Sequence, residues 1–428
     1  MPEDQGKDQA EGARAPKRKS STIAEITENF IQHIDSLLNS LPLAMTAIQS
    51  AHKGAHASYE EFVKNHCEEH QDADGTTHVT VQLEHHDRFK KLRKRVDQTA
   101  IAFSDVPRSF LVSLVSQYDA FLGKLVRTAF KLKPELLKSS EKTLTFSQLS
   151  EFSSLEDATE HLLEKEVETL LRKSHADQFE WLENRVGIKL RVDLPVWPTF
   201  IEVTERRNLF VHCDGVVSSQ YMGTCREHRV PGDAIAELGA RLEVPYKYFR
   251  AAHEAIFEIG VKLAQVLWRR LRLESLEAAD SALNNITYDL LERRRYHLAK
   301  VLLDFVFTPA VKYSDEQYRL IFLVNRSQAY KWSGDNKRAH ELVLAQDWTA
   351  TREAFKLAAA VLTDRNQDAI DLMRKIGVGG YPHKVHYRTW PLFMEIRKTP
   401  EFALVFEEIF GECFGMPEPI PKLMQTPP

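Results

Sequence analysis

Apolar residues recur at helical spacing through most of this chain, which predicts an all-α protein. Ser21 and Thr22 can cap a first helix, and Pro42 is expected to kink that helix or to start the next segment. Residues 84–131 carry the strongest pattern, an apolar face wide enough for a helix buried in a bundle. We expect an interruption of this long helix at Pro107.

The elements that follow are expected to complete an N-terminal helical domain over residues 21–275. Helices are predicted over residues 154–171, 174–186, 198–212 and 244–273. Residues 188–194 alternate between apolar and charged, which allows one short strand. Residues 66–80 have the composition of a loop, and the His and Cys residues in it lack a second ligand pair at metal-site spacing. We therefore expect no metal site there.

The pattern changes over residues 278–412, where the helices become shorter and small residues mark their contacts. A shift of 30 residues aligns Ala329 with Ala359, and it aligns the turn at Gly334 with Asp364. This weak repeat predicts helix–turn–helix units and resembles tetratricopeptide repeats, whose usual period of about 34 residues is longer. Only two units are visible, fewer than the three or so that a solenoid needs. Flanking helices over 281–306 and 400–412 would then act as caps.

Composition and charge narrow the class of protein. The 428 residues carry 57 Lys and Arg against 61 Asp and Glu, so a generally basic nucleic-acid coat is disfavoured and RNA contact needs a local patch. The four cysteines form no C-x-x-C pair, and no apolar run reaches the roughly 20 residues of a membrane span. We expect a cytoplasmic protein without membrane contact, with a disordered tail at 1–20 and an irregular tail at 413–428.

Residues 206–212, with the sequence Arg-Arg-Asn-Leu-Phe-Val-His, bring chemically useful side chains onto one expected helix. Asn208 and His212 are four residues apart and share a helix face, with Arg207 one step round. Metal-free RNA cleavage needs a base for the 2′-OH proton, an acid for the leaving 5′-oxygen, and positive charge for the phosphate oxygens. An imidazole can serve as either acid or base, and a guanidinium fits phosphate. One helix supplies one histidine, so two copies around a twofold axis would provide both.

The motif R-N-x-x-x-H at Arg207, Asn208 and His212 resembles the active-site motif of HEPN ribonucleases, the "higher eukaryotes and prokaryotes nucleotide-binding" helical domains. The resemblance covers roughly residues 20–275. It implies a metal-independent endoribonuclease that needs no cofactor, places the motif across a homodimer interface, and leaves a cyclic phosphate. It also implies a HEPN-like helical bundle and a role in bacterial or antiviral defence, or a toxin-like response.

Further basic residues are candidates for holding the RNA. Arg206 gives the spacing R-x5-H with the same histidine, and Arg226 and Arg229 follow shortly after the motif. Lys189, Arg191 and Arg241 can add to a local positive funnel, although each alone is also a typical surface residue. The arginine clusters at 269–272 and 293–295 are expected on helix surfaces or in contacts between domains.

Three hypotheses stay open. The first is an endoribonuclease that a C-terminal helical-repeat domain directs or holds in check. The second is a non-catalytic adaptor whose repeats bind protein partners, with Arg206 and Arg207 on a solvated face and His212 as a helix-terminal residue. The third is a nucleotide-binding member of the same fold.

Overall fold

The computed structural model describes residues 22–415 apart from 73, 75–76, 138–143, 193 and 310. Within that part, sixteen α-helices and a single two-stranded hairpin confirm the all-α prediction. The expected tail at 1–20 and nearly all of the one at 413–428 lie outside the described residues. None of the described helices combines the length and the apolar character that crossing a bilayer requires.

Two long antiparallel helices form the backbone of the molecule. They are α1 (Ile23–His66) and α2 (His86–Leu132), and Thr22 caps α1 by a capping box with Glu25. Both helices continue through a proline, so the interruption predicted at Pro107 is wrong, and Pro42 does not start a new segment. Each proline removes one backbone hydrogen bond, and the extended packing of α1 on α2 outweighs that local cost.

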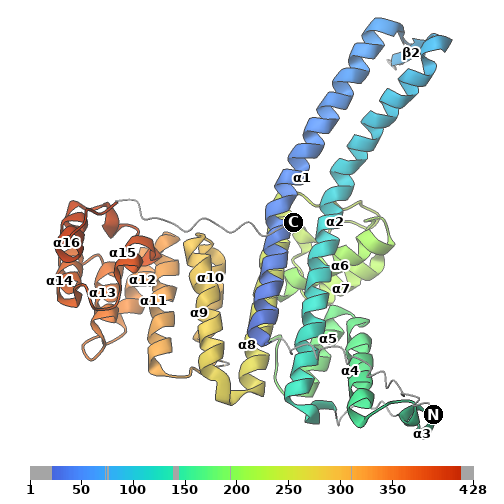
Figure 1. Cartoon of the computed structure of the whole chain (residues 1–428). Coiled ribbons are helices and arrows are strands. Elements are labelled where there is room, and N and C mark those ends of the chain that lie inside the picture. The colour runs from blue at the N-terminus through green and yellow to red at the C-terminus, as the bar shows by residue number, and fades with distance from the viewer. Residues whose placement is uncertain are drawn as a thin grey trace, which may run out of the picture.

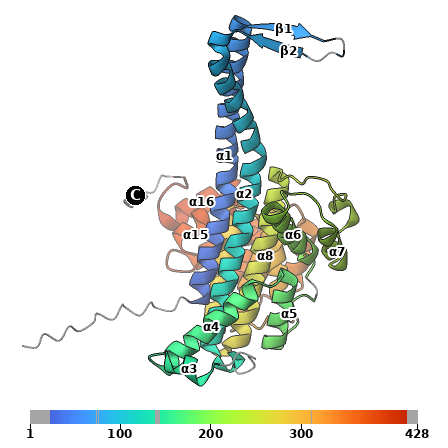
Figure 2. The ribbon, with the colours of Figure 1, turned by 90° about the vertical axis from the view of Figure 1, so that its right-hand side faces the viewer.

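The segment that connects α1 to α2 is a β-hairpin, which corrects the loop predicted over 66–80. Strands β1 (Cys67–Gln71) and β2 (Thr77–Val81) pair antiparallel with Cys67 opposite Val81. Threonine and valine in β2 suit a strand, and the adjacent ends of α1 and α2 bring the strands together. Residues 46–106, which we refer to as the arm, project beyond the other helices with this hairpin at the tip (Figures 1 and 2).

The bundle around the base of the arm positions the motif at 206–212. Helix α8 (Tyr246–Leu271) packs on both α1 and α2. A Cβ at Gly260 would lie 2.4 Å from the ring of Phe30, so this close approach of α8 to α1 requires glycine. The remaining helices are α3 (Phe146–Ser150), α4 (Leu155–Leu171), α5 (His175–Val186), α6 (Trp197–His212) and α7 (Ser219–Glu227). The described residues of 188–194 form bends and turns, not the strand that their alternation allowed.

Three helical hairpins follow, one more than the repeat in the sequence indicated. They pair α9 (Leu276–Glu292) with α10 (Tyr296–Val306), α11 (Glu316–Trp332) with α12 (Asn336–Leu344), and α13 (Glu353–Leu362) with α14 (Asn366–Ile376). Each turn contains one residue with positive φ, namely Arg294, Gly334 and Asp364. The next residue always donates to a carbonyl five positions back, as Arg295 does to Leu290 at 2.8 Å. Helices α15 (Lys384–Thr389) and α16 (Pro400–Phe410) end the array (Figure 1).

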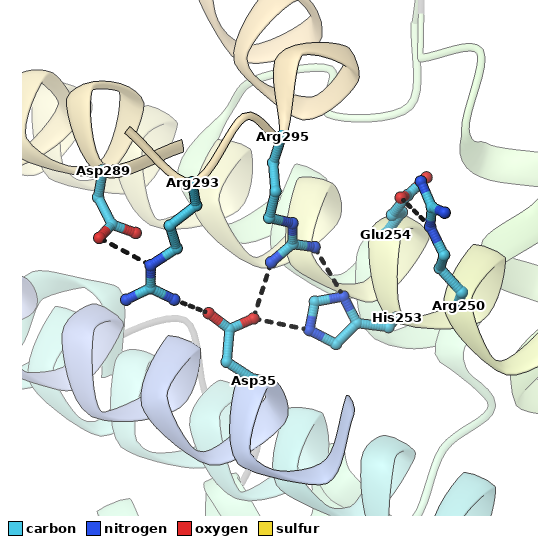
Figure 3. A network of polar contacts seen from close by, with 7 residues as sticks. All are labelled: Asp35, Arg250, His253, Glu254, Asp289, Arg293 and Arg295. Atoms are coloured by element: carbon cyan, nitrogen blue, oxygen red, sulfur yellow. Dashed lines mark hydrogen bonds and ion pairs between the residues drawn. The ribbon is translucent and has the colours of Figure 1, made fainter. Parts of the chain in front are cut away.

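The expected domain boundary at 275–278 falls inside a continuous core. The largest apolar cluster runs from Ile23 to Ala329, and a second cluster covers Val324 to Phe406. A polar network also connects α1, α8 and the turn between α9 and α10 (Figure 3). Asp35 of α1 accepts hydrogen bonds at 2.9 Å from Arg293, from Arg295 and from His253 of α8. The arginine cluster at 293–295 therefore joins the first hairpin to the N-terminal bundle.

Candidate functional site

Helix α6 presents residues 206–212 at its C-terminal end. Proline stands in its first turn, and the buried side chains of Phe200, Ile201 and Val203 attach it to the bundle. The chain leaves the helix through Asp214 and Gly215, both at positive φ. A Cβ at Gly215 would meet the ring of Phe210 at 2.9 Å, so the tight exit from α6 depends on this glycine.

Arg206 points into the protein, which corrects its assignment as a substrate-binding residue. Its Nε donates to Glu202 at 2.7 Å, its Nη1 donates to the Glu243 carbonyl at 3.0 Å, and its guanidinium lies 3.9 Å from the centre of the Tyr248 ring. Tyr221 and Tyr248 also donate to Glu202, at 2.7 and 2.6 Å. A buried guanidinium with these partners is committed to the core and has no path to a phosphate.

Arg207, the next residue, lies near the surface and is positioned by residues of two other helices, α2 and α5. Its Nη2 donates to Asp119 of α2 at 3.1 Å, and the side chain keeps 20% exposure. His175, the first residue of α5, donates to the other oxygen of Asp119 at 2.9 Å and is only 5% exposed. The Arg207 Nε–H is buried and has no acceptor among the described residues. The guanidinium is therefore oriented by Asp119 and retains donors for an anion.

Asn208 and Glu205 lie beside this arrangement. Asn208 donates from Nδ2 to the Glu205 carboxyl at 3.3 Å, a long hydrogen bond. Burial raises the pKa of Glu205, although the nearby His175 and Arg207 oppose the shift. Glu205 thus adds a half-buried carboxyl that binds a proton more readily than a solvated one, next to the fixed guanidinium.

His212 is the last residue of α6 and is exposed. In the part of the chain that the structure describes, its ring makes no hydrogen bond or ion pair, so it is free to contact a ligand. Two residues further along, the Asp214 carboxylate pairs with Arg241 at 2.5 Å and with Arg108 at 3.6 Å. Arg241 is the one member of the expected positive funnel that these contacts place close to the end of α6.

The structure separates Arg226 and Arg229 from the motif, which corrects their assignment to the same site. Both are exposed, but α7 runs back along α6, and His228 between them contacts Trp197 at the start of α6. At 1.5 Å per residue, the two ends of α6 lie roughly 20 Å apart. Arg191 is taken up by Glu183 at 2.6 Å. These cations therefore do not surround His212.

The sequence pattern did not single out Asp119, His175 or Glu205 as functional residues. Asp119 left a signal, because it is a carboxylate directly after the buried Tyr118, within a stretch of α2 that is otherwise rich in apolar residues. His175 left none, since it stands 56 residues from Asp119 at the start of a different helix. Among the described residues, no group of three or more His, Cys, Asp or Glu side chains is arranged to hold a metal ion.

No protein-family model, no curated protein and no solved structure matches this chain. The resemblance to HEPN ribonucleases and that to tetratricopeptide repeats therefore stay predictions. What the site offers chemically is a guanidinium oriented by a carboxylate, a carboxamide beside it, and an accessible imidazole one turn further along the same helix.

Proposed function

We propose that this protein is a metal-independent endoribonuclease, built as a HEPN-like helical bundle followed by a tetratricopeptide-like array. One observation carries the proposal. Arg207 is oriented through Asp119 by the buried His175, while His212 on the same helix remains exposed. A surface arginine that only contributes to solubility does not need its carboxylate partner to be fixed by a buried histidine, as His175 fixes Asp119. Holding a charged group in place before the substrate arrives is what electrostatic catalysis needs.

Each side chain has a distinct role in this chemistry. Arg207 binds the non-bridging oxygens of the scissile phosphate, and Asn208 orients the same group. The His212 imidazole transfers protons. When the 2′-oxygen attacks phosphorus, one imidazole takes its proton, and a protonated imidazole donates to the departing 5′-oxygen. The products are a 2′,3′-cyclic phosphate and a 5′-hydroxyl, so the reaction consumes no water and no metal.

The acid and the base come from two copies of the chain in this proposal. The surface around His212 suits a second copy, because Val211 is 51% exposed and Val216 and Leu238 nearby are also exposed. Backbone hydrogen bonds between Val217 and the 239–240 turn hold Leu238 beside the exit of α6. Exposed apolar side chains around a polar site are typical of surfaces that bind another protein.

The test is cleavage of mixed RNA by the full chain in the presence of EDTA. The wild type should release fragments that end in cyclic phosphate. His212→Ala should lower the rate by about 100-fold or more and keep the helical circular dichroism. His33→Ala is the matched control, because His33 is also an exposed histidine on a helix. Equal cleavage by the wild type and His212→Ala would refute the proposed site.

The solution mass tests the two-copy arrangement separately. Active protein should be a dimer at the concentrations where it cleaves, and Val211→Asp should produce monomers that cleave slowly. An enzyme that cleaves at full rate as a strict monomer would contradict the shared site. The full chain is needed for both tests, since ending it near residue 275 would expose the core side chains of α8 that α9 and α10 cover.

One observation favours the adaptor hypothesis as a second candidate. A cavity of about 840 Å³ lies between α9, α11, α13 and α15, and it is lined by Asn284, Asn325 and Trp390 among others. The Trp390 indole N–H is buried without an acceptor among the described residues. Such a cavity fits a peptide segment of a partner protein. Stable binding of a partner through this cavity, together with no cleavage of any RNA, would favour the adaptor.

A further inference from the structure

The arm carries a concentrated run of positive charge that the net charge of the chain hides. Six of the eight residues from 88 to 95 in α2 are basic, and these six, which we refer to as the basic run, are Arg88, Lys90, Lys91, Arg93, Lys94 and Arg95. Asp87 and Asp97 bracket the run. The whole chain has a net charge of −4, so this is a local feature of one helix.

Helical periodicity turns every cation of the basic run outward. Phe89, Leu92 and Val96 are half-buried and lie on the side of α2 that packs against α1. Phe89, for example, contacts the rings of Tyr59 and Phe62 across the helix pair. The contact between α1 and α2, which we refer to as the seam, thus uses the apolar side chains of this stretch. The six basic side chains remain exposed to solvent.

The basic run is not neutralised by the protein. None of its six cations forms an ion pair with another described residue, although Arg88 lies over the Phe62 ring at 5.5 Å. On the facing stretch of α1, Glu60 is paired with His56 at 3.2 Å, and Glu61 is exposed. Elsewhere on the surface several exposed arginines and lysines have acidic partners three or four residues away, as Lys398 has in Glu395 and Arg172 has in Glu168. Six unpaired cations over two helical turns repel one another unless an anion neutralises them.

We propose that the arm binds the phosphate backbone of RNA through the basic run and so holds the substrate of the site at the end of α6. This inference deepens the proposed function and rests on it for the identity of the nucleic acid. Helix α2 carries both parts, the basic run on the arm and Asp119 in the bundle. They lie roughly 36 Å apart along the helix axis, a distance that several nucleotides of an extended strand span. Recognition is of the backbone, without base specificity, because lysine and arginine on an exposed helix face contact phosphates.

An anionic membrane surface is the competing ligand, and the geometry disfavours it. A helix that lies in a membrane interface needs an outward apolar face beneath its cations. Here the apolar positions of the same helical stretch pack on α1. Leu83 at the tip is 90% exposed, but it stands outside the basic run. The vesicle measurement below decides between the two ligands.

The experiment measures binding, so that it does not depend on cleavage. Fluorescein-labelled single-stranded RNA of mixed sequence is titrated with the full chain in the His212→Ala background, and polarisation is followed at several salt concentrations. The arm variant carries Lys90→Ala, Lys91→Ala and Lys94→Ala. Alanine preserves the helix, and none of these side chains contributes to the seam. The matched control removes the same charge from Lys124, Lys337 and Lys398, which are exposed outside the arm.

The arm variant should bind RNA at least about 10-fold more weakly than the control variant. The slope of log K against log salt should become shallower by about 2, since each phosphate contact on a single strand contributes about 0.7. Equal affinities and slopes for the two variants would overturn the inference. So would binding to phosphatidylserine-containing vesicles that only the arm variant loses, with RNA binding unchanged.

The outcomes separate this inference from the proposed function. If RNA binding depends on the arm but the wild type never cleaves RNA, the proposed role of the arm is supported and the proposed nuclease activity is refuted. If cleavage needs His212 but RNA binding is insensitive to the basic run, the proposed nuclease activity is supported and the proposed role of the arm is refuted.

Discussion

Arg207 of α6 donates a hydrogen bond to Asp119 of α2 at 3.1 Å, across 88 residues of sequence. The same carboxylate accepts from His175 of α5, so three helices meet at one polar cluster. Packing of these helices fixes where the guanidinium points before any ligand binds. The orientation of Arg207 is therefore a property of the bundle, not of the motif alone.

Asp119→Asn tests this relationship. Asparagine keeps the size of the side chain but removes the charge that holds Arg207 and His175. We expect RNA cleavage to fall by about 100-fold, because a displaced catalytic group loses most of its effect. Thermal unfolding should show a loss of about 1–3 kcal/mol for the weakened buried hydrogen bond. Asp105→Asn, an exposed position on the same helix, is the control and should change neither quantity.

Replacing Arg206 should mainly lower the folding stability, whereas replacing Arg207 should mainly lower RNA cleavage. Arg206→Ala leaves the buried Glu202 without its cation and should cost about 3–5 kcal/mol of folding free energy. Arg207→Ala should cost about 1 kcal/mol and still abolish cleavage. Denaturant unfolding and RNA cleavage, measured on both variants, check the contrast. Similar stability losses for the two variants would contradict the division of roles.

His253→Gln should reduce the acid sensitivity of the junction between α1, α8 and the first hairpin. Burial lowers the pKa of His253, although Asp35 and Glu254 oppose the shift, and Arg295 donates to its Nδ1 at 3.1 Å. The folded protein thus favours neutral imidazole. This stabilisation is complete above the ordinary pKa of 6.5 and is lost as the pH falls through 6.5 toward the folded value.

Glutamine can donate to Asp35 and accept from Arg295 without titrating. Between about pH 7.5 and pH 5.5, the melting temperature of the wild type should therefore fall more than that of His253→Gln. The advantage of the wild type over the variant should shrink with acidity, as measured by scanning fluorimetry. A gap that widens toward low pH would show that His253 is charged in the folded protein.

The turns of the three hairpins offer a matched pair of substitutions. Gly334 has a φ of +95°, so Gly334→Ala should destabilise the second hairpin by about 1 kcal/mol. Arg294 has a φ of +57° and an exposed side chain, so Arg294→Gly should stabilise the first turn by a similar amount. Melting temperatures should shift in opposite directions. Shifts of the same sign would mean that backbone strain does not dominate at these turns.

Local signals in the sequence predicted most helices well. Ser154 caps α4, and α5 and α8 begin and end within two residues of their predicted limits. The interruption predicted at Pro107 is wrong, because the contacts between α1 and α2 along their length are invisible to a local rule. The first hairpin was also missed, since its turn carries Arg294 where the second carries glycine.

The basic run on α2 was missed for a related reason. Its residues belong to a long amphipathic helix, and only the tertiary structure shows that this stretch projects from the bundle on the arm (Figure 2) and that its six cations are exposed. The net charge of −4 for the whole chain does not reveal such a local run of cations.

The sequence by itself determined most of the helices, caps such as those of α1 and α4, and the presence of Arg207, Asn208 and His212 on α6. Only the tertiary structure decided that Arg206 is buried and Arg207 is available, although the two are neighbours. Successive residues on a helix point about 100° apart, and which direction is interior depends on what the other helices supply. Glu202, Tyr221 and Tyr248 enclose one guanidinium, and Asp119 holds the other at the surface.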